Sequence, residues 1–235
     1  MSKEINRMFS RIAKNYDRAN RIITLGMDVR WRTRAARMCV AQGNNLKIFD
    51  VATGTGDLAM AVSREAKRLG KRVSVTGLDF NDDMLRVARQ KINRKGIDNI
   101  ELVGGDALYT KLRDKSFDVV TCGFSMRGFD DLYKFLREMY RILKPGGRVV
   151  FLDVARPDSP LSGLLERYYM RVVPAIGAMY NKDAYVYLVS SIWKFDKERL
   201  AKLARQVGFK NVKITNLSLR IVYILTCTKP AKKEN

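Results

Sequence analysis

The pattern of apolar and polar positions divides the chain into a helical beginning, an alternating middle and a mixed end. Apolar residues at helical spacing predict two helices in the beginning, over residues 3–19 and Val29–Ala41. In the middle, short apolar runs alternate with amphipathic segments. The predicted strands there are Lys47–Ala52, Arg72–Leu78, Ile100–Val103, Phe117–Cys122 and Arg148–Val154. The predicted helices between them are Leu58–Leu69, Asp82–Arg94 and Leu132–Leu143.

This alternation predicts the fold class. Parallel strands need long crossover connections, and a helix after each strand supplies them, so we expect a doubly wound, mostly parallel α/β sheet. The end of the chain departs from the rhythm, with helices predicted over Leu161–Val173, Ala184–Trp193 and Lys197–Val207. Two closely spaced strands, Val212–Thr215 and Ile221–Thr226, predict an antiparallel hairpin at one edge of the sheet. The whole pattern is typical of a Rossmann-like domain.

The length of 235 residues suits one such domain with a full core and leaves little room for a second. We therefore treat residues 1–235 as a single domain made of four segments. They are an N-terminal helical lid (1–45), a ligand-binding core (46–157), an insertion that caps the pocket (158–195) and a C-terminal helix with a hairpin (196–235).

Composition narrows the chemistry. The chain has no histidine, which excludes catalysis by serine–histidine or cysteine–histidine pairs and removes the commonest metal ligand. Its three cysteines, Cys39, Cys122 and Cys227, are far apart, so we expect neither a disulfide framework nor a zinc site. We expect no other bound metal either. Such cysteines suit a reducing cytoplasm. No apolar run approaches the roughly 20 residues of a membrane span.

The charge is strongly positive. The sequence holds 45 Lys and Arg against 24 Asp and Glu, for a formal net charge of +21. Such an excess favours an anionic partner, either a nucleic acid or an acidic membrane surface. The basic residues are spread along the chain without a compact block, which favours general surface chemistry over a dedicated nucleic-acid site.

The segment Asp50–Asp57 (DVATGTGD) is a glycine-rich turn between a predicted strand and a predicted helix. Glycines there let the backbone approach a ligand closely, and the helix N-terminus offers free N–H groups. Gly54, Gly56 and Ala59 also fit the dinucleotide fingerprint G-x-G-x-x-G/A. The turn alone therefore leaves a dinucleotide and another adenosine ligand open.

Carboxylates at the ends of three successive strands discriminate between these ligands. Asp50 would repel a pyrophosphate but suits an ammonium group, and Asp79 can accept both hydroxyls of a ribose. Asp106 can accept an adenine amino group or cap a helix. Met84 can pack on an adenine or in the core. Together these residues favour a neutral or cationic adenosine ligand over a dinucleotide.

Nearly the whole chain resembles the ubiquinone/menaquinone-biosynthesis C-methyltransferase family. The similar segments are Met8–Asn20 (MFSRIAKNYDRAN), Asp50–Ala59 (DVATGTGDLA) and Asp183–Phe195 (DAYVYLVSSIWKF). The last of them is the most specific to the family. The residues around Arg127 resemble its F-G-[IL]-R-N segment, with Ser125 and Gly128 as departures that bear on the acceptor's identity.

This resemblance implies a class I methyltransferase that uses S-adenosylmethionine (SAM) and methylates a ring carbon of a polyprenylated quinol precursor, such as demethylmenaquinol or a related benzoquinol. It implies that Thr55, Asp79, Asp106 and Ala107 contact SAM. The cofactor-binding residues expected from the motif and the resemblance together are Asp50, Gly54, Thr55, Gly56, Asp79, Met84, Asp106 and Ala107.

The resemblance also implies the catalytic residues. Arg127 matches the family's arginine near the substrate ring, and we expect it to stabilise the phenolate form of the acceptor and to hold the water that takes the proton. Tyr16 is expected in the lid over SAM. An apolar channel for the prenyl chain is expected from residues 172–180 together with the N-terminal helix.

Other functions stay open at this point. The acceptor could be a sterol, a phospholipid amine or a polyketide. RNA is less favoured, because no asparagine/aspartate-proline-proline-aromatic signature follows the fourth strand. A non-enzymatic module that binds SAM or NAD is a further alternative. With a lipophilic quinol as substrate, we expect a cytoplasmic enzyme that associates peripherally with the inner face of an anionic membrane. We expect no nucleic-acid partner. A homodimer remains open.

Overall fold

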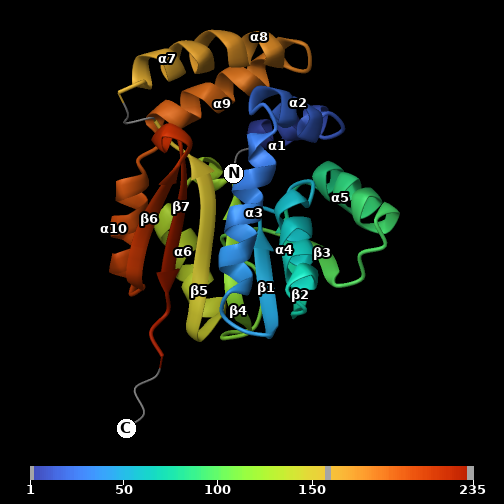
Figure 1. Cartoon of the computed structure of the whole chain (residues 1–235), viewed down its shortest axis with the longest axis vertical. Coiled ribbons are helices and arrows are strands. Elements are labelled where there is room, and N and C mark those ends of the chain that lie inside the picture. Colours follow the sequence, from blue (N-terminus) through green and yellow to red (C-terminus); the bar gives the residue numbers. More distant parts are fainter. Residues whose placement is uncertain (1–2, 157–159, 232–235) are drawn as a thin grey trace.

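A seven-stranded sheet forms the centre of the molecule, with strand order β3-β2-β1-β4-β5-β7-β6 (Figure 1). The structure, a computed structural model, describes residues 3–156 and 160–231. The strands are β1 (Asn45–Val51), β2 (Arg72–Asp79), β3 (Ile100–Gly104), β4 (Phe117–Gly123), β5 (Leu143–Val154), β6 (Lys210–Leu217) and β7 (Val222–Thr228). The strands β1 to β5 pair in parallel, and β7 pairs antiparallel with β5 and β6. The predicted fold class and its antiparallel edge are confirmed.

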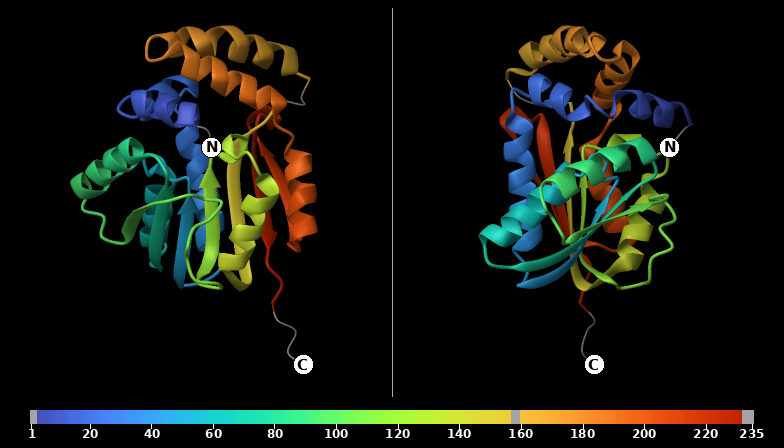
Figure 2. Two further views of the ribbon diagram at one scale, coloured as in Figure 1. Left: turned by 180° about the vertical axis from the view of Figure 1, so that it is seen from behind. Right: turned by 90° about the vertical axis from the view of Figure 1, so that its right-hand side faces the viewer.

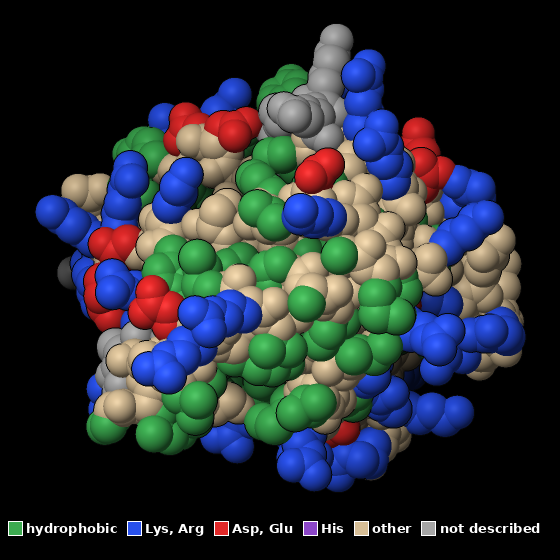
Figure 3. Space-filling model, turned by 90° about the horizontal axis from the view of Figure 1, so that it is seen from above, with side chains coloured by type: hydrophobic (Ala, Val, Ile, Leu, Met, Phe, Trp, Pro, Cys, Tyr) green, Lys and Arg blue, Asp and Glu red, His purple; other side chains and the backbone are tan. Residues whose placement is uncertain are grey.

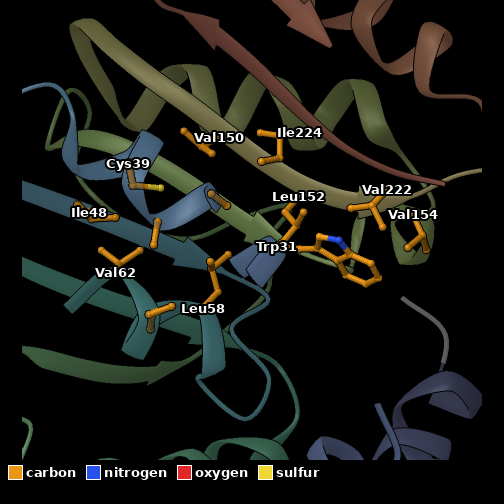
Figure 4. Close-up of a cluster of buried hydrophobic side chains, with 14 of the residues drawn as sticks. Trp31, Cys39, Ile48, Leu58, Val62, Val150, Leu152, Val154, Val222 and Ile224 are labelled. Atoms are coloured by element: carbon orange, nitrogen blue, oxygen red, sulfur yellow. The ribbon is translucent and has the colours of Figure 1, made fainter. Parts of the chain in front are cut away.

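Helices cover both faces of this sheet (Figure 2). Those of the core are α3 (Met27–Val40), α4 (Asp57–Arg68), α5 (Asp82–Arg94), α6 (Leu132–Ile142) and α10 (Lys197–Val207). Neighbouring strand residues point to opposite faces. In β1, Ile48 joins the cluster beneath α3 and α4, whereas Phe49 joins the cluster beneath α6 and α10. Figure 4 shows the first cluster, in which Trp31 of α3 lies beside Leu152 and Val154 of β5 and Val222 of β7.

Two helical layers lie above the carboxyl ends of the parallel strands (Figures 1 and 2). We call α1 (Lys3–Ile12) and α2 (Tyr16–Ile23) the lid helices. The cap consists of α7 (Ser162–Arg167), a π-helical turn (Tyr168–Val172), α8 (Val173–Ala178) and α9 (Lys182–Lys194). Short 3-10 turns follow β4 (Met126–Gly128) and β6 (Ser218–Arg220). Among the described residues, no helix combines the length and the apolar character needed to cross a bilayer.

The prediction of one helix over residues 3–19 is wrong, because the lid consists of two helices. The amide of Asn15 bonds the carbonyl of Ile12, three residues back, so the i→i−4 ladder ends there. Phe9 and Tyr16 remain neighbours across the bend, with ring centroids 6.1 Å apart in an edge-on arrangement. Two rings seven residues apart also lie on one face of an unbroken helix, so their spacing could not reveal the bend.

The first cap helix extends beyond its predicted end at Val173. Helical structure continues to Ala178 through the π-helical turn, and Pro174 lies in the first turn of α8. A proline has no N–H to donate and its ring crowds the preceding turn, which accounts for the wider π-helical spacing before it. The boundary expected between residues 157 and 158 falls outside the described residues.

Candidate active site

The main cavity lies where the strand order reverses, at the carboxyl ends of β1 and β4. This is the position at which doubly wound sheets bind their ligands. The cavity encloses about 1130 Å³ of empty space, part of it open to solvent. The lid helices line it with Ile5, Phe9, Ile12, Tyr16 and Asn20, and α9 lines it with Ala184, Tyr185, Tyr187, Leu188 and Ser191. The sheet side contributes the charged side chains Asp50, Asp79 and Arg127, while lid and cap contribute mostly apolar and aromatic side chains.

A second cavity of about 680 Å³ lies beside the first. The two cavities share Ala52, Asp79 and Phe80 in their walls. Asp106 and Ala107 line the second cavity, where the Asp106 carboxylate accepts a hydrogen bond of 2.8 Å from the amide of Leu108. An elongated ligand that passes Asp79 can thus occupy both cavities.

Asp50 is fully buried at the end of β1 and lines the main cavity. Its Oδ2 accepts a hydrogen bond of 2.6 Å from the Thr53 hydroxyl, but its Oδ1 has no partner among the described residues. Burial raises the pKa of Asp50 to about 7, with Asp79 acting in the same direction. A buried carboxylate oxygen without a donor is costly, so this position suits a cationic group of a ligand.

Asp79 ends β2 and holds the glycine turn. Its Oδ2 accepts the amide of Gly54 at 2.7 Å, and its Oδ1 accepts the amide of Asn81 at 2.9 Å. Burial raises its pKa, and these backbone N–H groups oppose the rise. A carboxylate has about four lone-pair sites, so each oxygen keeps one for a ligand hydroxyl.

The two glycines of the turn have different surroundings. Gly54 has a φ of +55°, and nothing lies within 4 Å of the position a Cβ would take, so its bare backbone faces the main cavity. Gly56 begins α4 with a φ of +79°, and a Cβ there would lie 3.3 Å from the Cβ of Ala88. Gly56 is thus a packing position and lines neither cavity, whereas Met84 of α5 is buried in the wall of the main cavity.

An ion network that the sequence did not reveal joins the lid to this turn. The Thr55 hydroxyl donates to Asp17 of α2 at 2.6 Å. Lys91 of α5 pairs with Asp17 and donates to Asp57 at 2.6 Å. Although burial alone raises it, the pKa of Asp57 is lowered by Arg32 and Lys91. These side chains hold α2 over the turn.

Arg127 lies in the 3-10 turn after β4 and lines the main cavity. Its Nε donates to the buried Asp153 of β5 at 3.0 Å, and its Nη1 donates to Ser191 of α9 at 2.8 Å. Longer contacts run from Nη1 to the carbonyl of Leu188 and from Nη2 to that of Phe124. These bonds use four of the five guanidinium N–H groups, so one remains for a ligand oxygen.

Two tyrosines reach the cavity from lid and cap. Tyr16 is half-buried, and burial raises its pKa although Arg32 and Arg127 oppose the rise. Tyr185 is buried, its hydroxyl has no partner among the described residues, and burial raises its pKa. Both phenols therefore stay protonated near neutral pH and can donate hydrogen bonds. The sequence segment DAYVYL contained Tyr185, but only the structure shows its hydroxyl unpaired at the cavity.

The predicted catalytic and binding residues thus come together at one edge of the sheet. Tyr16, Asp50, Gly54, Thr55, Asp79, Met84 and Arg127 line the main cavity, and Asp79, Asp106 and Ala107 line the second. Sequence reasoning missed the lid network around Asp17 and Lys91 and the unpaired hydroxyl of Tyr185. The residues of the network lie on α2, α4, α5 and the glycine turn, so no local pattern joins them.

Comparison with known proteins agrees with this geometry. The sequence profile of the ubiE/COQ5 methyltransferase family matches residues 1–229. A demethylmenaquinone methyltransferase of Deinococcus radiodurans is 43% identical over 210 residues, which cover 88% of this chain and 85% of that protein. A demethylmenaquinone methyltransferase of Lactobacillus johnsonii is 37% identical over 221 residues, which cover 92% of this chain and 89% of that protein.

Solved structures share the fold at low sequence identity. Phosphoethanolamine N-methyltransferase 2 of Haemonchus contortus, in complex with SAM, aligns with a TM-score of 0.64 and 17% identity over 85% of this chain. This chain spans about half of that longer protein, 52% of its length. A SAM-dependent methyltransferase of Aquifex aeolicus aligns with a TM-score of 0.59 and 16% identity, and the alignment covers 83% of this chain and 89% of that protein. The chain therefore belongs to the ubiE/COQ5 methyltransferase family and is a SAM-dependent methyltransferase.

Proposed function

We propose that this enzyme transfers the methyl group of SAM to a ring carbon of a demethylated isoprenoid quinol of the demethylmenaquinol kind. The observation that carries the proposal is a buried guanidinium, that of Arg127, with one N–H left over in a largely apolar cavity beside the glycine turn. The names of the relatives from D. radiodurans and L. johnsonii support the same acceptor.

The residues present fit the methyl donor. The unpaired Oδ1 of Asp50 fits the ammonium of its methionine part, and the free lone pairs of Asp79 fit the two ribose hydroxyls. The second cavity, with Asp106 and Ala107 in its wall, fits the adenine. When bound, SAM supplies a methyl group that is already activated on a sulfonium.

The remaining task is to make a ring carbon nucleophilic. A free phenol has a pKa of about 10, and a fixed cation next to its oxygen favours the phenolate. Arg127 provides that cation, because Asp153, Ser191 and two backbone carbonyls hold its guanidinium rigidly. We assign the phenol's proton to a water bound by Arg127. The hydrogen on the methylated ring carbon then leaves as a proton, which restores the aromatic ring, and the quinol oxygen is reprotonated, so one proton is released per methyl transferred. The phenols of Tyr16 and Tyr185 remain protonated and donate to the acceptor's other oxygen.

The lid and the cap orient the acceptor and exclude water. Their apolar side chains surround the quinol ring, and positioning of this kind lowers the barrier by about 7–11 kcal/mol. Residues 172–180, expected to form the prenyl channel with the N-terminal helix, line neither cavity. A prenyl chain would instead leave between α1 and α9, whose side chains line the main cavity together. A lipophilic acceptor and a net charge of +21 also favour peripheral attachment to an anionic membrane.

A panel of acceptors tests the proposal. The purified enzyme is given SAM and, separately, reduced demethylmenaquinone, a demethylated benzoquinol, a sterol, a phospholipid amine and RNA. We expect methyl transfer to the quinols, with product on a ring carbon. Faster turnover of any other member of the panel would contradict the proposed acceptor.

The affinity for SAM should depend on pH through Asp50. Its raised pKa of about 7 means that acidification protonates it and removes the charge that faces the ligand's ammonium. We expect the Kd for SAM to rise about tenfold between roughly pH 7.5 and pH 6. Isothermal titration at several pH values measures this, and Asp50→Asn should bind more weakly without the acidic dependence. An equally steep dependence in Asp50→Asn would assign the titration to another group.

Release of SAM should be controlled by the lid network. Lys91→Met removes the cation between Asp17 and Asp57, so α2 loses charge-assisted hydrogen bonds. One such bond contributes about 1.5 kcal/mol, so we expect SAM to dissociate about tenfold faster. Stopped-flow displacement measures the rate, with Lys95→Met, an exposed lysine at the end of the same helix, as the charge-matched control. Equal dissociation rates in the two variants would contradict a role of Lys91 in holding the lid.

A further inference from the structure

The outer side of the cap exposes large apolar side chains. Leu164 is 66% exposed, Met170 56% and Met179 79%. Leu161 and Val172 of the same segment are exposed as well. Figure 3 looks down on this side and shows apolar side chains across its middle, with lysines and arginines mainly around them. Met170 and Val172 are two positions apart in the π-helical turn and point to opposite flanks of the buried Tyr169 and Val173. We therefore call the four residues Leu161, Leu164, Val172 and Met179 the cap face.

Basic side chains accompany the cap face. Arg167, Arg171 and Lys182 of the cap and Lys14 and Arg18 of the lid are exposed, and within the described part of the chain none of them forms an ion pair. The exposed acids of the described cap are Glu166 and Asp183. An apolar surface with excess positive charge beside it is complementary to an anionic lipid surface, which supplies hydrocarbon and negative head groups together.

The cap face lies on the far side of the helices that cover the cavity. On α9, Tyr185 and Leu188 line the cavity, whereas Val186 between them is exposed. On the lid, Phe9 lines the cavity while Arg11 and Lys14 are exposed. The α7–α8 segment that carries the cap face and the helix α9 beneath it thus separate the cap face from the proposed acceptor.

We propose that the cap face binds the surface of an anionic phospholipid bilayer, with its apolar side chains among the head groups and its basic side chains against the phosphates. The proposal rests on the proposed function only in that the acceptor dissolves in such a bilayer. A two-fold contact between copies of this chain would bring the same basic residues together. An RNA site would place basic or aromatic side chains where Leu164 and Met179 stand.

Sedimentation with vesicles tests the proposal. The full chain is mixed with vesicles of phosphatidylglycerol and phosphatidylcholine, or of phosphatidylcholine alone, and the bound fraction is measured. We expect binding to the anionic vesicles only, weakened by salt. Leu164→Glu and Met179→Glu should each lower the partition coefficient about tenfold, because binding scales with buried apolar area and the added carboxylate is repelled. Leu69→Glu is the matched control, since Leu69 is 44% exposed at the end of α4, away from the cap.

Turnover of a short-chain quinol dissolved in buffer separates this proposal from the proposed function. We expect Leu164→Glu and Met179→Glu to retain wild-type turnover of that soluble acceptor. If the wild-type enzyme bound vesicles but did not methylate the quinol, the proposed function would be contradicted, and the cap face would still be a lipid-binding surface. Wild-type vesicle binding in both variants would overturn the cap-face proposal. The cap-face proposal would also be overturned if these variants bound vesicles like the wild type but changed from dimer to monomer or lost RNA binding.

Discussion

Replacement of Arg127 by methionine should lower kcat roughly a hundred- to thousandfold, the usual cost of losing one preorganised charge at a developing oxyanion. SAM should still bind, because the guanidinium contacts Asp153, Ser191 and the carbonyls of Phe124 and Leu188 and none of the residues assigned to the donor. Single-turnover kinetics and isothermal titration measure the two effects separately. Near-normal kcat in a folded Arg127→Met variant would refute the assigned role.

A second substitution keeps this test informative. Asp153 is fully buried, and removing its only ion-pair partner among the described residues costs about 3–5 kcal/mol of stability. Arg127→Lys retains a positive charge against Asp153 but not the planar fork that reaches Ser191 as well. We expect it to fold and to show intermediate kcat. Arg141→Lys, which changes a similar arginine network on α6, should leave kcat unchanged and serves as the control.

Removal of the Asp79 side chain should have the largest effect on donor binding. Asp79→Ala loses two ribose contacts to a carboxylate, each of about 1.5–3 kcal/mol, so the Kd for SAM should rise at least a hundredfold. It also frees the amide of Gly54, which loosens the turn. Titration with SAM measures the Kd, and Asp82→Ala, an exposed acid three residues on, is the matched control.

The variant Asp79→Asn separates charge from shape. Its amide oxygen can still accept one backbone N–H, so the turn should persist while one acceptor and the negative charge are lost. The new amide NH2 faces the other backbone N–H, which loses its acceptor, so this variant should lower the melting temperature moderately. We expect an affinity between those of the wild type and Asp79→Ala. Wild-type affinity in both variants would contradict the placement of the ribose.

The sequence was sufficient for the sheet and for the residues at its edge. Apolar runs alternating with amphipathic segments predict parallel strands, and parallel strands carry their carboxyl ends to one edge. Asp50, Asp79 and Asp106 therefore had to lie near one another once the strands were recognised. The resemblance added Arg127, whose residue type alone would have suggested an ordinary ion pair.

The lid and the cap could not be predicted in the same detail. The bend after Ile12 preserves the spacing of Phe9 and Tyr16, so the apolar period is unchanged. The ion network depends on Lys91 reaching Asp17 from 74 positions away, which no local pattern encodes. The unpaired hydroxyl of Tyr185 is a property of its surroundings. Contacts between distant segments, rather than period or propensity, decided these features.

The most direct test of the proposed methyl transfer uses SAM with a deuterated methyl group and reduced demethylmenaquinone as acceptor. Mass spectrometry and NMR of the extracted product locate the label. We expect one labelled methyl on a ring carbon of the quinol, formed by the wild type and nearly absent with Arg127→Met. Label on an oxygen, or no label in the quinone while SAM remains bound, would contradict it.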